Sequence, residues 1–276
     1  MTLLSSEKAI IEAAYLKNTQ GQSLSLEEKS IIEKIIILLD QGKIRVCEKI
    51  EEKWITHQWI KMAILLYFSI RPMEKIECGP FSFFDKIPNK QWGPLDQVRV
   101  VPTGLVRLGA FISPKCVLMP SYVNIGAYVG EGSMVDTWAT VGSCAQIGKY
   151  VHLSGGVGIG GVLEPLQASP VIIEDHAFIG SRCIIVEGVI IEDRAIIGAG
   201  VTITASTKII DVSGDSPVEY KGKVPSSSVV IPGTIQKEFP AGIFGVSCAL
   251  IIGKRKQTSD EKTSLNETLR DFNVSV

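Results

Sequence analysis

The chain has 276 residues, of which 45% are hydrophobic and 7% aromatic, and 28 Lys and Arg face 29 Asp and Glu for a net charge of −1. The balanced charge argues against a nucleic-acid binder, which needs a basic field, and the apolar content argues against disorder. No apolar run approaches the ~18 residues of a membrane helix, and the polar residues at 1–8 do not match a signal peptide. Six cysteines without a C-x-x-C spacing predict reduced thiols and a cytoplasmic protein.

The first 98 residues are typical of a small α/β domain. A capping box beginning at Ser25 opens a helix whose apolar residues at 31–39 share one face. Residues 44–50 and 53–56 predict a short hairpin, and a second helix fits 57–69. We expect this domain also to cap the first coil of the repeat that follows it, because an uncapped coil exposes unpaired backbone groups.

The next hundred residues carry a repeat. Most of the 26 glycines lie between Gly104 and Gly200, and an aliphatic residue recurs there every six positions. The series is Val117, Val123, Val129, Val135, Val141, Ile147, Leu153, Ile159, then Ile173, Ile179, Ile185, Ile191, Ile197, Ile203 and Ile209. A small or β-branched residue stands four places after nearly every one. A period of six fits short strands joined by corners, so we predict a hexapeptide β-helix of about five coils with this series pointing inward.

The frame breaks between Ile159 and Ile173, which are two residues further apart than two hexads. The interruption at 162–170 contains two prolines and predicts a loop pushed out of the wall. From the residues alone, a functional loop and a harmless surface insertion fit equally well.

The last part of the chain is predicted to be rich in strands. Strands are expected at 218–220, 228–231 and 243–252, and a capping-box pattern at 264–267 predicts a short final helix. The expected division is an N-terminal α/β domain at 1–98, a β-helix domain at 99–210 and a C-terminal extension at 211–276.

The motifs of the central stretch resemble those of a known family. They are Met134-Val135-Asp136-Thr137-Trp138, His152-Leu153-Ser154-Gly155-Gly156-Val157-Gly158, Thr56-His57-Gln58-Trp59 and Arg99-Val100-Val101-Pro102. This pattern resembles the tetrahydrodipicolinate N-succinyltransferase family of hexapeptide-repeat acyltransferases. The similarity runs through nearly the whole chain and weakens after residue 206.

The resemblance implies a left-handed parallel β-helix, a hand that the residues alone could not give because parallel crossovers are right-handed in about 98% of cases. It also implies a homotrimer with active sites between adjacent barrels. The implied reaction moves succinyl from succinyl-CoA, a co-substrate rather than a resident cofactor, to the amine of open-chain tetrahydrodipicolinate in lysine and diaminopimelate biosynthesis.

Asp136 is the candidate catalytic residue. It directly follows the inward Val135, so its side chain should leave the barrel, and the resemblance places it at the substrate amine. Its reference pKa of about 3.9 makes it a weak base. Burial between subunits could raise that pKa, or the carboxylate could only orient the ammonium. A solvated wall aspartate is the alternative.

Further binding roles come from the resemblance and from side-chain chemistry. Arg99 suits a substrate carboxylate, or else an ion pair between domains. Trp138 and Ser154 should project outward near the substrate, or pack in the trimer. Gly155 and Gly156 could line the pantetheine slot or serve only as corners. The cations Lys254 and Arg255, with Lys256, could hold the CoA phosphates or form a solvated turn.

Two departures leave the mechanism open. Close relatives often carry a carboxylate where this chain has Ile184, so either Glu187 substitutes or Asp136 acts without a partner. His152 should face outward, and we interpret it as an interface residue more readily than as the base.

Other functions remain possible from the sequence. A zinc hydratase on the same fold needs three converging histidines, and only His152 and His176 lie in the repeat, so no metal site is predicted. Another acyl-CoA transferase, for example one that transfers acetyl, and a non-catalytic scaffold are the remaining alternatives.

Overall fold

The computed structural model describes residues 4–255. Three helices form most of the N-terminal region: α1 (Ser5–Thr19), α2 (Leu26–Asp40) and α3 (Gln58–Ile70). The predicted capping box is confirmed, since Ser25 Oγ accepts from the Glu28 N–H at 3.1 Å. The sequence did not predict α1, because this helix has no side-chain cap and buries only two apolar residues.

Two hairpins accompany the helices. The predicted hairpin is confirmed as β1 (Cys47–Ile50) paired with β2 (Lys53–Thr56). A second hairpin, β3 (Glu74–Cys78) with β4 (Phe81–Asp85), was not predicted. Its side chains are mostly exposed on both faces, so its sequence lacks the alternation that marks a half-buried strand.

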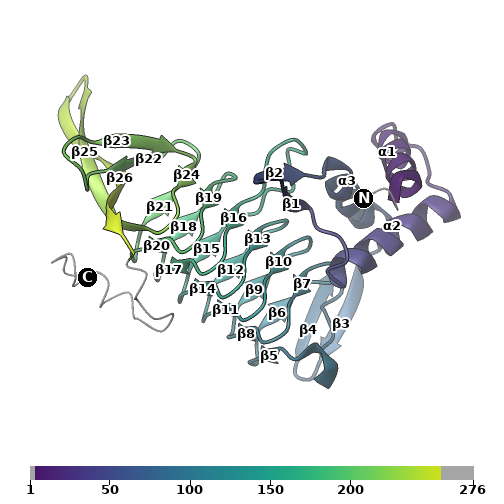
Figure 1. The fold of residues 1–276 in the computed structure, drawn as a ribbon. Coiled ribbons are helices and arrows are strands. Elements are labelled where there is room, and N and C mark those ends of the chain that lie inside the picture. Colours follow the sequence, from purple (N-terminus) through teal and green to yellow (C-terminus); the bar gives the residue numbers. More distant parts are fainter. Residues whose placement is uncertain (1–3, 256–276) are drawn as a thin grey trace.

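The centre of the chain is a prism of two-residue strands (Figure 1). In chain order the strands are β5 (Arg99–Val100), β6 (Leu105–Val106), β7 (Phe111–Ile112), β8 (Val117–Leu118), β9 (Tyr122–Val123), β10 (Tyr128–Val129), β11 (Met134–Val135), β12 (Thr140–Val141), β13 (Gln146–Ile147), β14 (His152–Leu153), β15 (Gly158–Ile159), β16 (Ile172–Ile173), β17 (Phe178–Ile179), β18 (Ile184–Ile185), β19 (Ile190–Ile191), β20 (Ile196–Ile197) and β21 (Thr202–Ile203). Every third strand pairs in parallel, which builds three sheets. We call them the β5 face, the β6 face and the β7 face after their first strands.

The predicted hexad frame is correct from Val123 to Ile203 and differs at its two ends. At the far end Ile209 is buried as predicted, but its strand does not stack on β19, where residues 223–224 pair instead. Val135 pairs in register with Leu118, which is fully buried, whereas Val117 is only half-buried. The inward positions Leu118 and Val123 are therefore five residues apart instead of six. The inward residues before Leu118 are consequently out of step with the later series, so the series did not reveal them. The prism begins earlier, at β5. The β5 and β6 faces therefore hold six of these prism strands each and the β7 face holds five, which makes nearly six coils rather than the predicted five.

The cap on the first coil comes from the segment before β5 rather than from the helices. Lys90 N–H donates to the Val106 carbonyl at 2.8 Å, and Leu108 N–H donates to the Pro88 carbonyl at 2.9 Å. Trp92 packs against the prism core. The helices instead lie along one edge of the prism (Figure 1), where their core takes in corner residues of successive coils. The expectation that the helical domain caps the first coil is thus correct only for its last segment.

The corner residues that join the helical core are Leu108, Ile125 and Cys144, with Leu163 from the loop.

The C-terminal part is a β-rich extension, as predicted. After β22 (Lys208–Asp211) and β23 (Val218–Lys221), the chain returns to the prism as β24 (Lys223–Val224). It then forms a long antiparallel hairpin, β25 (Ser228–Phe239) with β26 (Gly242–Lys254), which projects from the end of the prism (Figure 1). The predicted helix at 264–267 lies outside the described residues.

The predicted interruption at 162–170 is confirmed as a loop without strands between β15 and β16. All six cysteines are free. Over the described part of the chain, no helix has the length and apolar character to span a membrane.

Candidate active site

The corner between the β5 and β6 faces brings together several predicted site residues. Asp136 follows β11 and donates its N–H to the Leu153 carbonyl of the next coil at 2.9 Å. Gly156 N–H donates to the Thr137 carbonyl, also at 2.9 Å. Residues 136–138 and 154–156 therefore lie on adjacent coils at one corner. We call this corner, from Asp136–Trp138 to Ser154–Gly156, the glycine corner.

Asp136 is half-buried, and its carboxylate is held by its neighbour. Oδ1 accepts from the Thr137 N–H at 2.6 Å and from Thr137 Oγ1 at 3.3 Å. No described residue donates a hydrogen bond to Oδ2. One oxygen thus fixes the orientation of the group, and the other is available to a ligand.

His152 is closer to this chemistry than the sequence suggested. It lies on β14 in register with Met134, one coil from Asp136, and its ring stacks on Phe178 at 5.0 Å between centroids. Burial lowers the pKa of the imidazole, and the Asp136 charge opposes this only in part. The ring is therefore mostly neutral at neutral pH. The sequence contained a signal for this proximity, because the six-residue frame places His152 one coil above Met134 and therefore close to Asp136.

The two glycines of the corner differ in why they are glycine. Gly156 has a φ of +70°, and a Cβ there would lie 2.8 Å from Arg182 Cδ, so both the backbone conformation and the packing favour a glycine. At Gly155 the nearest atom to a Cβ would be the Thr137 carbonyl oxygen at 3.5 Å, an ordinary contact. Within the described chain the Gly155 N–H also donates to no acceptor. Packing does not explain Gly155, which leaves an open backbone strip.

Trp138 and Ser154 behave differently. Trp138 is 71% exposed and adopts a φ of +61°, so its large ring stands outside the wall. Ser154 is only 7% exposed, so its side chain does not project freely as expected. A contact with Ser154 would run mainly through its backbone.

Arg99 lies on the same face but at a distance. It is exposed on β5, in register with Val117, and Val117 is in turn in register with Met134. Two coils therefore separate it from Asp136, which corresponds to about 10 Å at 4.8 Å per coil. The structure does not bring the two side chains together within one chain.

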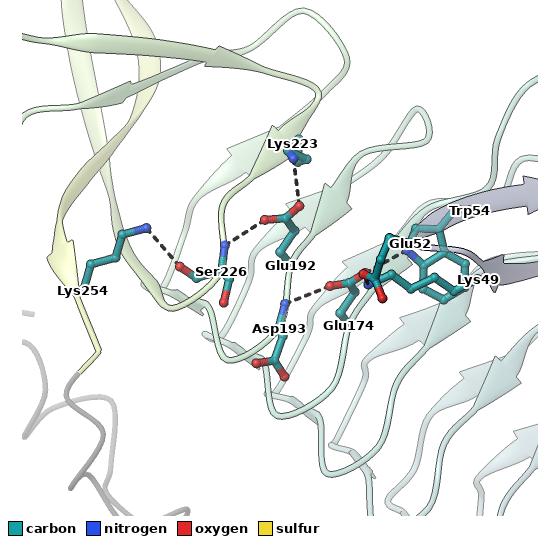
Figure 2. Close-up of polar contacts among 9 residues, drawn as sticks. All are labelled: Lys49, Glu52, Trp54, Glu174, Glu192, Asp193, Lys223, Ser226 and Lys254. Atoms are coloured by element: carbon teal, nitrogen blue, oxygen red, sulfur yellow. Dashed lines mark hydrogen bonds and ion pairs between the residues drawn. The ribbon is translucent and has the colours of Figure 1, made fainter.

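Lys254 and Arg255 lie at the corner between the β7 and β5 faces, along the other edge of the β5 face. Lys254 Nζ donates to the Ser226 carbonyl at 3.0 Å (Figure 2). It also donates to Ser228 Oγ at 3.0 Å. Arg255 Nη1 donates to the His176 carbonyl at 3.0 Å. These cations do not reach Asp136 within one chain, and Lys256 lies outside the described residues.

Glu187 is also separated from Asp136. It occupies the corner between the β6 and β7 faces, where Oε2 accepts from the Ala205 N–H at 3.1 Å. Ile184 stands on the β6 face, 38% exposed, directly beside Gly158. One whole face separates the two carboxylates, so Asp136 and Glu187 do not form a pair within one chain.

A network of acids at the β7/β5 corner was not predicted. Glu174 Oε1 accepts from Trp54 Nε1 at 2.8 Å and lies 3.2 Å from Lys49 Nζ, and Oε2 accepts from the Asp193 N–H at 3.1 Å (Figure 2). On the next coil, Glu192 pairs with a lysine and a backbone N–H. Both carboxylates are occupied. Glu174 fastens the β1–β2 hairpin to the prism, whereas Glu192 binds Lys223 and the Ser226 N–H beside its own coil. Among the described residues no cluster of three His, Cys, Asp or Glu could hold a metal.

Comparisons with known proteins identify relatives over nearly the whole chain. Residues 6–70 match the family model for the N-terminal part of tetrahydrodipicolinate N-succinyltransferase, and residues 170–205 match the hexapeptide repeat of succinyl-transferase. The chain is 50% identical over 274 residues to the 2,3,4,5-tetrahydropyridine-2,6-dicarboxylate N-succinyltransferase of Photorhabdus laumondii, covering 96% of this chain and 98% of the relative. It is 52% identical to the Bordetella pertussis enzyme of that name, covering 92% and 93%.

A solved structure supports the architecture. A Campylobacter jejuni protein, described as a tetrahydropyridine-2-carboxylate N-succinyltransferase, superposes with a TM-score of 0.53 at 19% identity, covering 83% of this chain and 64% of that one. Together with the hexapeptide match, it supports the left-handed parallel β-helix that the resemblance implied. The chain belongs to the 2,3,4,5-tetrahydropyridine-2,6-dicarboxylate N-succinyltransferase family.

Proposed function

We propose that this protein transfers the succinyl group of succinyl-CoA to the amine of tetrahydrodipicolinate, in its open-chain 2-amino-6-oxopimelate form, during lysine and diaminopimelate biosynthesis in the cytoplasm. The names of relatives about 50% identical over nearly the whole chain support the reaction. The observation in the structure that carries it is the oriented, partly unoccupied Asp136 carboxylate beside the open backbone of Gly155.

The chemistry follows from this arrangement. The free amine attacks the thioester carbonyl, the C–N bond forms, and the C–S bond breaks as CoA thiolate leaves. Once it has attacked, the nitrogen is cationic and strongly acidic, so even a weak carboxylate base such as Asp136 can receive its proton. Before that step the same carboxylate orients the amine. The unpaired Gly155 N–H supplies a donor to the tetrahedral oxyanion.

The site is proposed to be completed by assembly as a homotrimer. Arg99, for a substrate carboxylate, and Lys254 and Arg255, for the CoA phosphates, lie away from Asp136 in one chain. A neighbouring barrel seated on the glycine corner would present its own cations there. Exposed apolar groups on the β5 and β6 faces, including Trp138 and Ile184, would be covered by that contact.

A thiol-release assay tests the reaction. The purified protein is expected to release CoA from succinyl-CoA only when tetrahydrodipicolinate is present, and Arg99→Lys is expected to raise KM for the amine more than for succinyl-CoA. Absence of thiol release with tetrahydrodipicolinate would overturn the proposal. A preference for acetyl-CoA would replace succinyl by acetyl as the transferred group.

A further inference from the structure

One charged side chain is buried in the core of the N-terminal region. Lys61, on α3, is 0% exposed and ranks among the largest fully buried side chains. Its Nζ donates to the Ala168 carbonyl at 2.6 Å and lies 3.5 Å from the Pro165 carbonyl. No carboxylate in residues 4–255 pairs with it, and burial lowers its pKa. A buried ammonium is costly unless its hydrogen bonds are made, so these two carbonyls are its compensation.

Both acceptors belong to the loop at 162–170. The loop is also seated by Val162, whose N–H donates to the Ser143 carbonyl at 3.1 Å, and by Leu163, which packs into the helical core. On the other side, a Cβ on Gly188 would lie 2.6 Å from the Ser169 carbonyl oxygen. The loop is thus wedged between α3 and the β6/β7 corner, with Lys61 binding two of its peptide groups at once.

The position of the loop connects it to the glycine corner. Gly155, Gly158, Gly160 and Gly161 lead across the β6 face from that corner to the point where the loop begins. These four positions carry no side chain of their own. The strip is bordered on the next coil by Ile184 and Val186, whose side-chain atoms lie 2.8 Å from where a Cβ on Gly158 and Gly160 would be. The loop rises directly at its end, and Glu164, Gln167 and Ser169 are exposed on it.

We propose that Lys61 is a positioning residue for acyl transfer. It holds loop 162–170 as a fixed wall at the end of the glycine strip, against which the acyl-CoA arm is bound. This rests on the proposed succinyl transfer, although the contact between Lys61 and the loop does not. Lys61 does not touch substrate; it acts through the two carbonyls that it binds.

The test measures the loop and the kinetics separately. In Lys61→Met, which keeps the alkyl chain and removes the donor, amide hydrogen exchange in 162–170 is expected to accelerate about tenfold or more. KM for succinyl-CoA is expected to rise about tenfold, with a smaller change for the amine. Lys86→Met is the matched control, because Lys86 Nζ also binds a backbone carbonyl, that of Phe68 at 2.9 Å, away from the loop. It should leave both measurements unchanged.

Gly188→Ala displaces the loop from its other side without changing α3. This variant replaces Lys61→Met in both measurements if Lys61→Met does not fold. It is expected to produce the same acceleration and the same rise in KM. Unchanged loop exchange in Lys61→Met, or faster exchange with unchanged KM in either variant, would overturn the proposal. If the unmodified enzyme transfers no succinyl group, the proposed reaction fails, while hydrogen exchange still decides whether Lys61 holds the loop.

Discussion

Two corners of the prism place acidic residues at equivalent positions but use them differently. Asp136 and Glu174 each directly follow an inward aliphatic residue of the hexad frame. Glu174, at the β7/β5 corner, uses both oxygens on Trp54, Lys49 and a backbone N–H (Figure 2). Asp136, at the glycine corner, uses one oxygen on its neighbour and leaves the other open.

The difference separates a structural acid from a candidate functional one. A fully bonded carboxylate stabilises the fold and has no capacity left for a ligand. A half-buried carboxylate with a fixed orientation and one free oxygen still has an acceptor to offer a ligand. Replacing the carboxylate at each corner in turn tests this difference.

The largest expected effect is at Asp136. Asp136→Asn keeps the shape of the side chain but removes the group that receives the amine proton, so kcat should fall by about 10²–10⁴. The measurement is steady-state thiol release with succinyl-CoA and tetrahydrodipicolinate. Glu174→Gln is the matched control and should retain kcat. If Asp136→Asn keeps the wild-type kcat, the Asp136 carboxylate is not the group that receives the amine proton.

The second effect concerns stability. Glu174→Ala leaves Trp54 Nε1 and the Asp193 N–H without their acceptor, and is expected to cost about 1–3 kcal/mol. Glu131→Ala breaks an exposed pair with Lys115 and should cost about 1 kcal/mol or less. Chemical denaturation measures both. An equal loss in the two variants would show that the Glu174 network does not fasten the hairpin.

Much of the prism could be predicted because its inward positions repeat every six residues. The frame failed where Leu118 and Val123 are five residues apart, which concealed the first coil, and at Ile209, whose strand β22 pairs with β23 and β26 instead of stacking on β19. The β3–β4 hairpin escaped because exposure on both faces removes alternation.

The site could be predicted in part. Residues close in the frame, such as Asp136 and Gly155, were expected at one place and are found there. Arg99 is separated from them by two coils, the first of which the frame concealed, and Lys254 by the corner that it occupies. Composition reveals neither. Lys61 gave no signal at all, since a lysine in an apolar helix resembles any surface residue until its neighbours are known.

Alanine substitutions at Gly155 and Gly156 are expected to have different effects. Gly155→Ala adds a methyl group where the nearest atom is 3.5 Å away, so stability should change by less than about 0.5 kcal/mol. KM for succinyl-CoA should rise about tenfold, because the methyl group intrudes on the open strip. Gly156→Ala combines a positive φ with a contact to Arg182 and should lose about 1 kcal/mol or more. Thermal unfolding and kinetics on both variants test this division; a destabilised Gly155→Ala would assign both glycines to packing.

The smallest expected effect is the pH dependence contributed by His152. Burial lowers the pKa of His152 in the folded protein, while in the unfolded chain that pKa is near its ordinary value of 6.5. As the pH falls below about 6.5, the unfolded state therefore binds the proton first, and stability decreases until the pH passes the lower folded pKa. Above pH 6.5 the group is neutral in both states and contributes no slope. His152→Gln should thus unfold with a weaker loss of stability between pH 7.5 and pH 5 than the wild type. Denaturation midpoints at the two pH values measure this difference, and equal slopes would mean that the imidazole next to the glycine corner is as well solvated as in the unfolded chain.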